Sequence, residues 1–314
     1  MVAAGDSRLN DAHCHFFSAG FFAALSRDPS APRVADPSVD LPVALGWDPP
    51  GSSAQLADRW VAELDRYGVT RAALIASVPG DEASVAAAVA RHPSRFAGLF
   101  MVDPTGSDTG DRVRRGFREH GLRCACLFPA MHRFALDDDC VLAVFEAAAE
   151  FGRAVFVHCG VLAVGVRRKL NLVSRFDIRL GNPLALVPAA TAFPAVPVIV
   201  PHFGAGFLRE TLMAADLAPN IVVDSSSSNA WRRYLAPLDL AAVFRRTLDV
   251  MGSERILFGS DSSFFPRGWQ DGLHAALDEI GLDPPARAAI FADNFDRVFG
   301  SPDRSASSVV PAAA

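Results

Sequence analysis

Eight short apolar segments alternate with amphipathic segments along the chain. The apolar segments are nearly continuous hydrophobic runs, which is typical of strands covered on both faces. They lie at residues 9–13, 72–77, 96–102, 124–128, 154–158, 196–201, 221–224 and 256–260. Apolar residues recur at helical spacing in the segments between them, at 54–67, 82–92, 110–120, 138–151, 184–193, 207–215, 238–251 and 270–280. Alternating strands and helices indicate a parallel α/β sheet, and eight such units predict a (β/α)₈ TIM barrel.

An open, doubly wound sheet is the structural alternative to a barrel. Such a sheet would carry a glycine-rich phosphate turn after an early strand. Neither G-x-G-x-x-G nor G-x-x-x-x-G-K-[ST] occurs in the sequence. The pattern therefore favours the barrel.

Three segments exceed what a minimal barrel of about 250 residues requires. Residues 26–53 form an extended loop after the first predicted strand, and residues 160–183 form a basic loop after the fifth. The Ser/Ala/Pro-rich end of the chain, 301–314, shows no periodicity and is expected to be disordered. We therefore expect one barrel domain over 1–300, although the length of 314 residues would also allow two domains.

The composition excludes several classes of protein. Half of the residues are hydrophobic, and the formal net charge is -5, without the basic patch of a nucleic-acid-binding domain. The five cysteines are an odd number in a long chain, which argues against a disulfide framework. We find no apolar run long enough for a membrane helix and no secretory leader pattern at the start. The expectation is a cytoplasmic protein that binds neither nucleic acid nor membrane.

Histidine and aspartate side chains stand where four of the predicted strands end. The first strand ends in the H-x-H pair His13 and His15, the fifth in His158, the sixth before His202 and the eighth before Asp261. Strand ends of a barrel meet at one mouth, and i, i+2 residues point to one side of a strand. Each residue alone has an ordinary explanation: His158 could be a core histidine, and Asp261 a helix N-cap. Their conjunction predicts a metal site.

These motifs resemble those of the amidohydrolase superfamily. The closest likeness is to the amidohydrolase-2 branch, which includes the aminocarboxymuconate semialdehyde decarboxylase-like enzymes. The matching stretches are LNDAHCHFF, GLRCACLFPAMHRFALDDD, AVFVHCG, VIVPHFGAGFLRE and ILFGSDSSFFP. The resemblance implies that His13, His15, His158 and Asp261 bind a metal. It also implies that His202 and Asp261 handle protons.

The fourth predicted strand ends in Cys126-Leu127-Phe128-Pro129, without the lysine or glutamate that bridges two metals in binuclear relatives. One divalent ion is therefore expected, with Zn²⁺ first and Mn²⁺ or Fe²⁺ as alternatives. The departure also argues against TatD-like nucleases, which depend on more carboxylates.

Two reactions fit this set of residues. The leading hypothesis is hydrolysis of a small amide, ester or lactone by a metal-activated water. The alternative is non-oxidative decarboxylation of an aromatic or unsaturated acid at the same site. A barrel without catalytic activity is the third hypothesis, against which the complete set of five residues argues. The resemblance also implies a homodimer.

Four residues are candidates for contacts with the substrate: Trp47, Arg232, Arg267 and Trp269. They lie in segments after the first, seventh and eighth strands, which should cover the barrel mouth. Arginine suits the recognition of a carboxylate, although any one of these arginines could equally be solvated.

Overall fold

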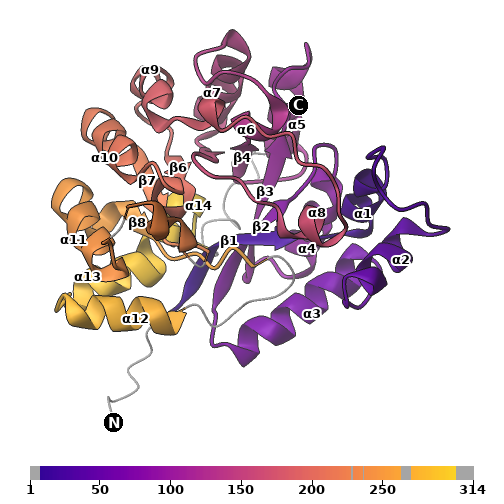
Figure 1. Ribbon diagram of the computed structural model, residues 1–314, viewed down its shortest axis with the longest axis horizontal. Helices are drawn as coiled ribbons and strands as arrows, with labels where there is room; N and C mark the ends of the chain where they lie inside the picture. Colours follow the sequence, from indigo (N-terminus) through magenta and orange to yellow (C-terminus); the bar gives the residue numbers. More distant parts are fainter. Residues whose placement is uncertain (1–7, 228, 236, 263–269, 302–314) are drawn as a thin grey trace, which may run out of the picture.

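Eight parallel strands form the centre of the molecule, in the order in which they occur along the chain (Figure 1). The computed structural model describes residues 8–227, 229–235, 237–262 and 270–301. The strands are β1 (Asn10–Phe16), β2 (Arg71–Ala76), β3 (Phe96–Val102), β4 (Cys124–Leu127), β5 (Ala154–Val157), β6 (Val198–Val200), β7 (Ile221–Asp224) and β8 (Ile256–Leu257). Each predicted strand is present, and the predicted (β/α)₈ barrel is confirmed.

Backbone hydrogen bonds bring the two ends of the sheet together. The amide of Ala12 donates to the carbonyl of Phe258, and the amide of His15 donates to that of Ser262. The amide of Asp261 donates to the carbonyl of His13. The segment after β8 therefore lies directly against β1, and this contact nearly closes the barrel.

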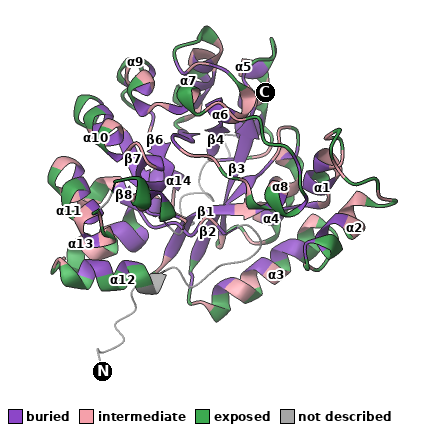
Figure 2. Cartoon of the chain, in the orientation of Figure 1, coloured by how far each residue is buried: buried purple, intermediate pink, exposed green. Residues whose placement is uncertain are grey.

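Helices surround the strands at the predicted positions, with their exposed faces outward (Figure 2). The main outer helices are α3 (Ser53–Arg66), α4 (Glu82–Arg91), α5 (Thr109–Arg118), α7 (Asp139–Phe151), α9 (Val187–Ala192), α10 (Leu208–Leu217), α11 (Leu240–Met251) and α12 (Gln270–Glu279). Shorter elements are α6 (Pro129–His132), η2 (Pro183–Leu186), η3 (Pro201–Gly204), η4 (Ala230–Leu235), η5 (Ser253–Arg255), α13 (Pro284–Ala288), η6 (Ala289–Asp293) and α14 (Asn294–Phe299). No helix of the described residues is both long and apolar enough to span a membrane.

Strand residues alternate between two hydrophobic layers. Outward residues such as Cys14 and Phe16 join the large layer between strands and helices. Inward residues such as Cys124, Cys126 and Phe156 fill the barrel itself, together with Phe295 of α14. This filling makes the barrel a packed scaffold whose strand ends hold side chains in fixed positions.

The two long loops expected after the first and fifth strands contain helices and pack against each other. Helix α1 (Ala19–Leu25) precedes the first loop, α2 (Pro37–Ala44) lies within it, and α8 (Gly165–Lys169) and η1 (Ile178–Gly181) lie in the second. We call their shared apolar cluster the roof cluster. It consists of Phe17, Phe21, Phe22, Leu25, Leu41, Leu45, Val166, Leu170 and Leu172.

One ion pair ties these two loops together. Arg167 of α8 donates to Asp28 at 2.5 Å, and Lys169 lies 5.3 Å from the ring centroid of Trp47. Figure 1 shows α1, α2 and α8 grouped on one side of the barrel. Sequence periodicity missed the short helices because each is a turn or two long.

Candidate metal centre

His13 and His15 project from β1 toward the same carboxylate. Nε2 of His13 lies 3.6 Å from Oδ1 of Asp261, and Nε2 of His15 lies 3.2 Å from the same oxygen. Cys14 between them points into the layer under the helices, as strand alternation requires. The ligand atoms of His13, His15 and Asp261 all lie within 4.8 Å of one another.

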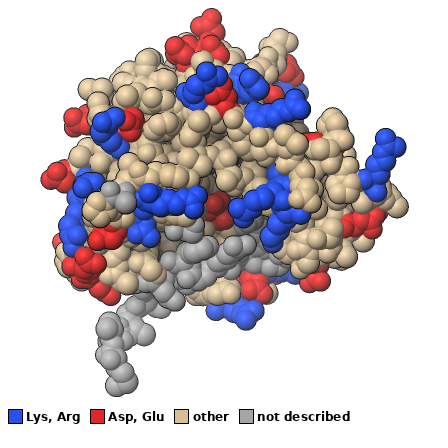
Figure 3. Space-filling model, in the orientation of Figure 1, with Lys and Arg blue, Asp and Glu red and all other residues tan. Residues whose placement is uncertain are grey.

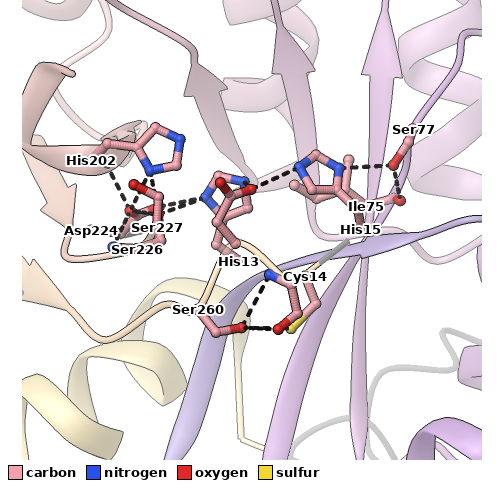
Figure 4. Close-up of polar contacts among 12 residues, drawn as sticks. His13, Cys14, His15, Ile75, Ser77, His202, Asp224, Ser226, Ser227 and Ser260 are labelled. Atoms are coloured by element: carbon pink, nitrogen blue, oxygen red, sulfur yellow. Dashed lines mark hydrogen bonds and ion pairs between the residues drawn. The ribbon is translucent and has the colours of Figure 1, made fainter. Parts of the chain in front are cut away.

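Hydrogen bonds at Nδ1 fix the tautomers of both histidines (Figure 4). Nδ1 of His13 lies 2.9 Å from Oδ2 of Asp224, which can only accept when ionised. Ser77 donates to the carbonyl of Ile75, so its oxygen accepts from Nδ1 of His15 at 2.9 Å. Both Nδ1 atoms therefore carry the proton, and both Nε2 atoms keep a free lone pair for a metal.

Asp261 is held at the mouth by a strained backbone. Its φ of 55° is left-handed, a conformation that is costly outside glycine and that clusters at functional sites. Burial alone would raise the pKa of its carboxyl group. The hydrogen bond to His15 and the neighbouring His202 and His13 outweigh burial and lower that pKa below its ordinary value. Asp261 is therefore an anion near neutral pH.

Asp11 belongs to the structural support of the site. Its Oδ1 accepts from the amides of His13 and Ser260, at 3.0 and 2.9 Å, and so ties β1 to the end of β8. Burial raises the pKa of Asp11. These contacts agree with the expectation that its side chain points away from the metal.

His158 follows β5 and is neutral in this environment. Its ring stacks on Phe128, with centroids 5.5 Å apart, and meets His202 edge to face at 5.3 Å. Burial, with smaller contributions from His202 and His13, lowers the pKa of His158 to about 3. Its buried Nδ1 has no hydrogen-bond partner among the described residues. A buried, uncharged imidazole with a free nitrogen is what a metal ligand requires.

His202 is part of a polar network with Asp224 and Ser226. Its amide donates to Oδ1 of Asp224 at 2.9 Å, and its Nδ1 lies 2.7 Å from Oγ of Ser226. Ser226 also donates its hydroxyl proton to Oδ1 of Asp224. Contacts with His13 and His202 outweigh the effect of burial and lower the pKa of Asp224 to about 2, so this carboxylate accepts.

A short left-handed turn carries His202. Five consecutive residues have positive φ: His202 (57°), Phe203 (52°), Gly204 (83°), Ala205 (44°) and Gly206 (104°). Such runs are rare, because each non-glycine residue in this conformation costs about 1–2 kcal/mol. The turn packs on Gly160, where any Cβ would overlap the carbonyl oxygen of Gly204. The strained backbone of this turn therefore holds the histidine in one specific position.

A cavity of about 340 Å³ opens over these side chains. One end is polar and is formed by the four histidines and Asp261. Its walls are mainly apolar, and the lining residues include Phe17, Phe21, Met101, Phe128, Met131, Leu162, Val164 and Trp231. Figure 3 shows Lys and Arg side chains on both sides of a hollow on the face that carries α8. The cavity can hold a small molecule with one polar end.

Two of the four predicted substrate residues, Trp47 and Arg232, belong to the described part of the chain, and neither is among the residues that line the cavity there. Trp47 packs against the roof cluster, and Phe17, which lines the cavity, stacks on both His15 and Trp47. Arg232 donates to the carbonyl of Asn229, whereas its neighbour Arg233 lines the cavity. Arg267 and Trp269 lie outside the described residues.

Sequence reasoning missed Asp224, Ser226 and Ser77. Asp224 stands at the end of a strand, which is the signal that singled out the other site residues. It went unnoticed because a run of serines, and no histidine, follows it in the sequence. Ser77 directly follows β2, but no pattern distinguishes a serine that orients a histidine from any other.

Comparison with known proteins identifies the family. The chain matches the amidohydrolase family over residues 10–301 and therefore belongs to it. No curated protein matches it. Among solved structures, a 5-carboxyvanillate decarboxylase from Sphingomonas paucimobilis superposes with a TM-score of 0.60 at 18% identity, covering 94% of this chain and 99% of that one.

Two further solved structures share the fold. A probable 2-pyrone-4,6-dicarboxylic acid hydrolase from Acinetobacter baumannii, with citric acid bound, has a TM-score of 0.59 at 14% identity and coverages of 93% and 99%. A 5-carboxyvanillate decarboxylase variant from Novosphingobium aromaticivorans, with bound manganese, has a TM-score of 0.58 at 16% identity. The match covers 93% of this chain and 96% of that one. The structural neighbours thus include a probable hydrolase and decarboxylases, and one of the decarboxylases holds manganese.

The donor set of this chain fits a single divalent ion. Three ligand atoms converge from His13, His15 and Asp261, and His158, whose buried Nδ1 has no hydrogen-bond partner among the described residues, lines the same cavity. His13, His202 and Asp224 form a second possible metal-binding group. In this group the oxygens of Asp224 already accept hydrogen bonds from His13 and His202. Imidazole and carboxylate donors suit zinc, manganese or iron.

Proposed function

We propose that the chain is a mononuclear metal-dependent hydrolase acting on a small amide, ester or lactone. His13, His15, His158 and Asp261 would hold the ion. When bound, such an ion acidifies a water molecule and polarises a carbonyl group. The apolar cavity walls would bind the rest of the substrate.

The tautomer of His202 carries this proposal. Ser226 donates its only proton to Asp224, so the contact of 2.7 Å to His202 must be donated by Nδ1–H of the histidine. Nε2 of His202 is then unprotonated while the ring is neutral. Burial lowers the pKa of His202 and so favours the neutral form. A neutral imidazole with a free Nε2 is a general base, which hydrolysis requires.

The chain's own residues account for the proton movements. His202 takes a proton from water at Nε2 as the water oxygen bonds to the carbonyl carbon. The same nitrogen returns the proton to the departing oxygen or nitrogen as its bond to that carbon breaks. The ionised Asp261 accepts a hydrogen bond from the attacking water and fixes its direction. Phe17, Phe21 and Phe128 line the cavity and would limit the access of further water to the reacting groups.

Decarboxylation of a small aromatic acid is the second candidate. Two of the structural neighbours are 5-carboxyvanillate decarboxylases, and the aromatic cavity walls would accept a ring. This reaction needs an acid that protonates a ring carbon. The unprotonated Nε2 of His202 suits it less well.

Product analysis separates the two candidates. Purified protein, with its metal content measured, is incubated with a panel of lactones, esters, amides and aromatic acids. Hydrolysis is expected, seen as the gain of water in the product mass. Release of CO₂ instead would establish the decarboxylase.

Two variants test the assignment of the residues. His202→Asn should retain the metal and lose activity by about 10²–10⁴-fold, as expected for a general base. His13→Ala should lose both metal and activity. Loss of metal in His202→Asn would show that His202 is a ligand. Wild-type protein that neither binds stoichiometric metal nor shows activity would refute both reactions.

A further inference from the structure

A cluster of arginines lies at the end of the barrel opposite the metal centre. Arg71 begins β2, Arg123 directly precedes β4, and Arg153 directly precedes β5. In a parallel barrel all strand starts share one end. The proposed function uses none of these residues.

Two of the arginines at this end form ion pairs with the nearby carboxylates. Arg71 donates to Oδ1 of Asp296 at 2.5 Å and to the carbonyl of Gly300 at 2.9 Å. Arg8 donates to Oδ2 of Asp296 at 2.5 Å and to Asp293 at 2.6 Å. Asp293 and Asp296 therefore neutralise Arg8 and Arg71.

Arg123 and Arg153 have no such partner. Neither side chain makes an ion pair or hydrogen bond within the described residues, and Nε of Arg153 is a buried donor without an acceptor. Burial lowers the pKa of both guanidinium groups, and no carboxylate of the described residues offsets this effect. A half-buried cation without a counterion destabilises the folded state. Binding of an anion to these two positive charges would remove that cost.

The two arginines stand side by side. Cys124 and Ala154 are partners in the β4–β5 register, and the amide of Ala154 donates to the carbonyl of Arg123. Adjacent strands lie about 4.8 Å apart, which brings Arg123 and Arg153 within reach of one ligand. The charge of Arg123 also lowers the pKa of Arg153, as expected for close cations. The guanidinium of Arg123 lies beside Gly300, where an added Cβ would be 3.7 Å from its Nη1.

We propose that Arg123 and Arg153 bind a small oxyanion with two negative charges, of the phosphate type, at the amino-terminal end of the barrel. Guanidinium groups present paired N–H donors that match the oxygens of such an anion. Two cations match a dianion better than a monocarboxylate. Because this end of a barrel supports stability rather than catalysis, the ligand stabilises the fold.

The test is a titration with inorganic phosphate. Calorimetry and thermal unfolding are followed at constant ionic strength, with chloride replaced by phosphate, on the metal-loaded protein. We expect phosphate to raise the Tm of the wild type. R123Q/R153Q should bind phosphate at least about tenfold more weakly, since each arginine contributes charge-assisted hydrogen bonds.

Two controls accompany this titration. R66Q, an exposed arginine on α3, should bind phosphate as the wild type does. R123Q/R153Q should keep wild-type catalytic activity and, without phosphate, should unfold at the same or a higher temperature, because it no longer buries unmatched charge. R153Q alone gives an intermediate affinity and serves if the double variant folds poorly.

Three results would overturn the proposal. Equal phosphate binding by R123Q/R153Q and wild type would place the anion elsewhere, for example at the metal centre. An equal rise in Tm with added chloride would show charge screening alone. Asp303 follows Gly300 by three residues and lies outside the described residues. Tighter phosphate binding by D303N than by wild type would show that the carboxylate of Asp303 is the natural partner of the two arginines.

Discussion

Oγ of Ser226 lies 2.7 Å from Nδ1 of His202, and the same hydroxyl donates to Asp224. Ser226 therefore sets which nitrogen of His202 faces the cavity with a lone pair. A residue that touches no substrate would in this way decide the direction of proton transfer.

Ser226→Ala should lower kcat about 10–100-fold, the usual effect of removing a group that orients a metal-site histidine. Metal content should stay close to that of the wild type, because His13 keeps its contact with Asp224 at 2.9 Å. Ser225→Ala is the matched control, since the buried hydroxyl of Ser225 has no hydrogen-bond partner among the described residues. Equal losses of kcat in the two variants would contradict the role of Ser226.

Asp224→Asn should weaken metal binding about 10–100-fold. The amide oxygen can still accept from the backbone of His202 and Ser226, which turns the amide NH₂ toward Nδ1 of His13. His13 must then place its proton on Nε2, where the metal would bind. A titration of the apoprotein with Zn²⁺ measures the effect.

Asp11→Asn is the control for this change. Oδ1 of Asp11 accepts two hydrogen bonds, whereas Oδ2 is unpaired within the described residues. An asparagine can therefore keep both hydrogen bonds, with its NH₂ group at the position of Oδ2. Metal affinity should change little. If Asp11→Asn and Asp224→Asn lose equal affinity, the tautomer argument fails.

The strands and their end residues could be predicted from sequence because both depend on local pattern. Apolar runs mark strands buried on both faces, and the strand ends of a barrel converge whatever the loops do. His13, His15, His158, His202 and Asp261 were therefore predicted from strand position, and the structure brings all five to one cavity.

The remainder of the site depends on packing between distant segments. Whether Arg232 or Arg233 faces the cavity is decided by a turn around Asn229, whose φ is 51°. Trp47 packs against Phe17 in the roof cluster, which joins segments more than 100 residues apart. Neither arrangement leaves a periodic signal in the sequence.

Gly160→Ala should reduce both stability and activity. Its φ is 77°, and a Cβ would lie 2.5 Å from the carbonyl oxygen of Ala205, in the turn that carries His202. The left-handed backbone alone costs an alanine about 1–2 kcal/mol, and overpacking adds about 1–3 kcal/mol. Gly68→Ala, with a φ of 67° and open space around it, should show the first cost only and leave kcat unchanged. Urea unfolding and kcat measure both effects, and equal stabilities of the two variants would refute the close approach.

The ion pair between Asp28 and Arg167 should make the stability contributed by the roof depend on pH. Hydrogen bonds from Ser30, followed by the contact with Arg167, lower the pKa of Asp28 to about 2 in the folded protein. The ordinary value in an unfolded chain is about 3.9. Because the folded pKa is the lower one, the carboxylate stabilises the fold fully above about pH 4, and this contribution disappears as the pH falls toward 2.

Asp28→Asn should therefore lower the free energy of unfolding at pH 5–7 by up to about 1 kcal/mol, since the pair is partly exposed. The difference from wild type should shrink below pH 4. In an Arg167→Gln background the same substitution should cost less, because the contact of 2.5 Å is already lost. Urea unfolding of the four proteins at pH 6 and pH 3 measures this cycle. A cost of Asp28→Asn that is equal at both pH values would show that the charge of Asp28 does not hold the two loops together.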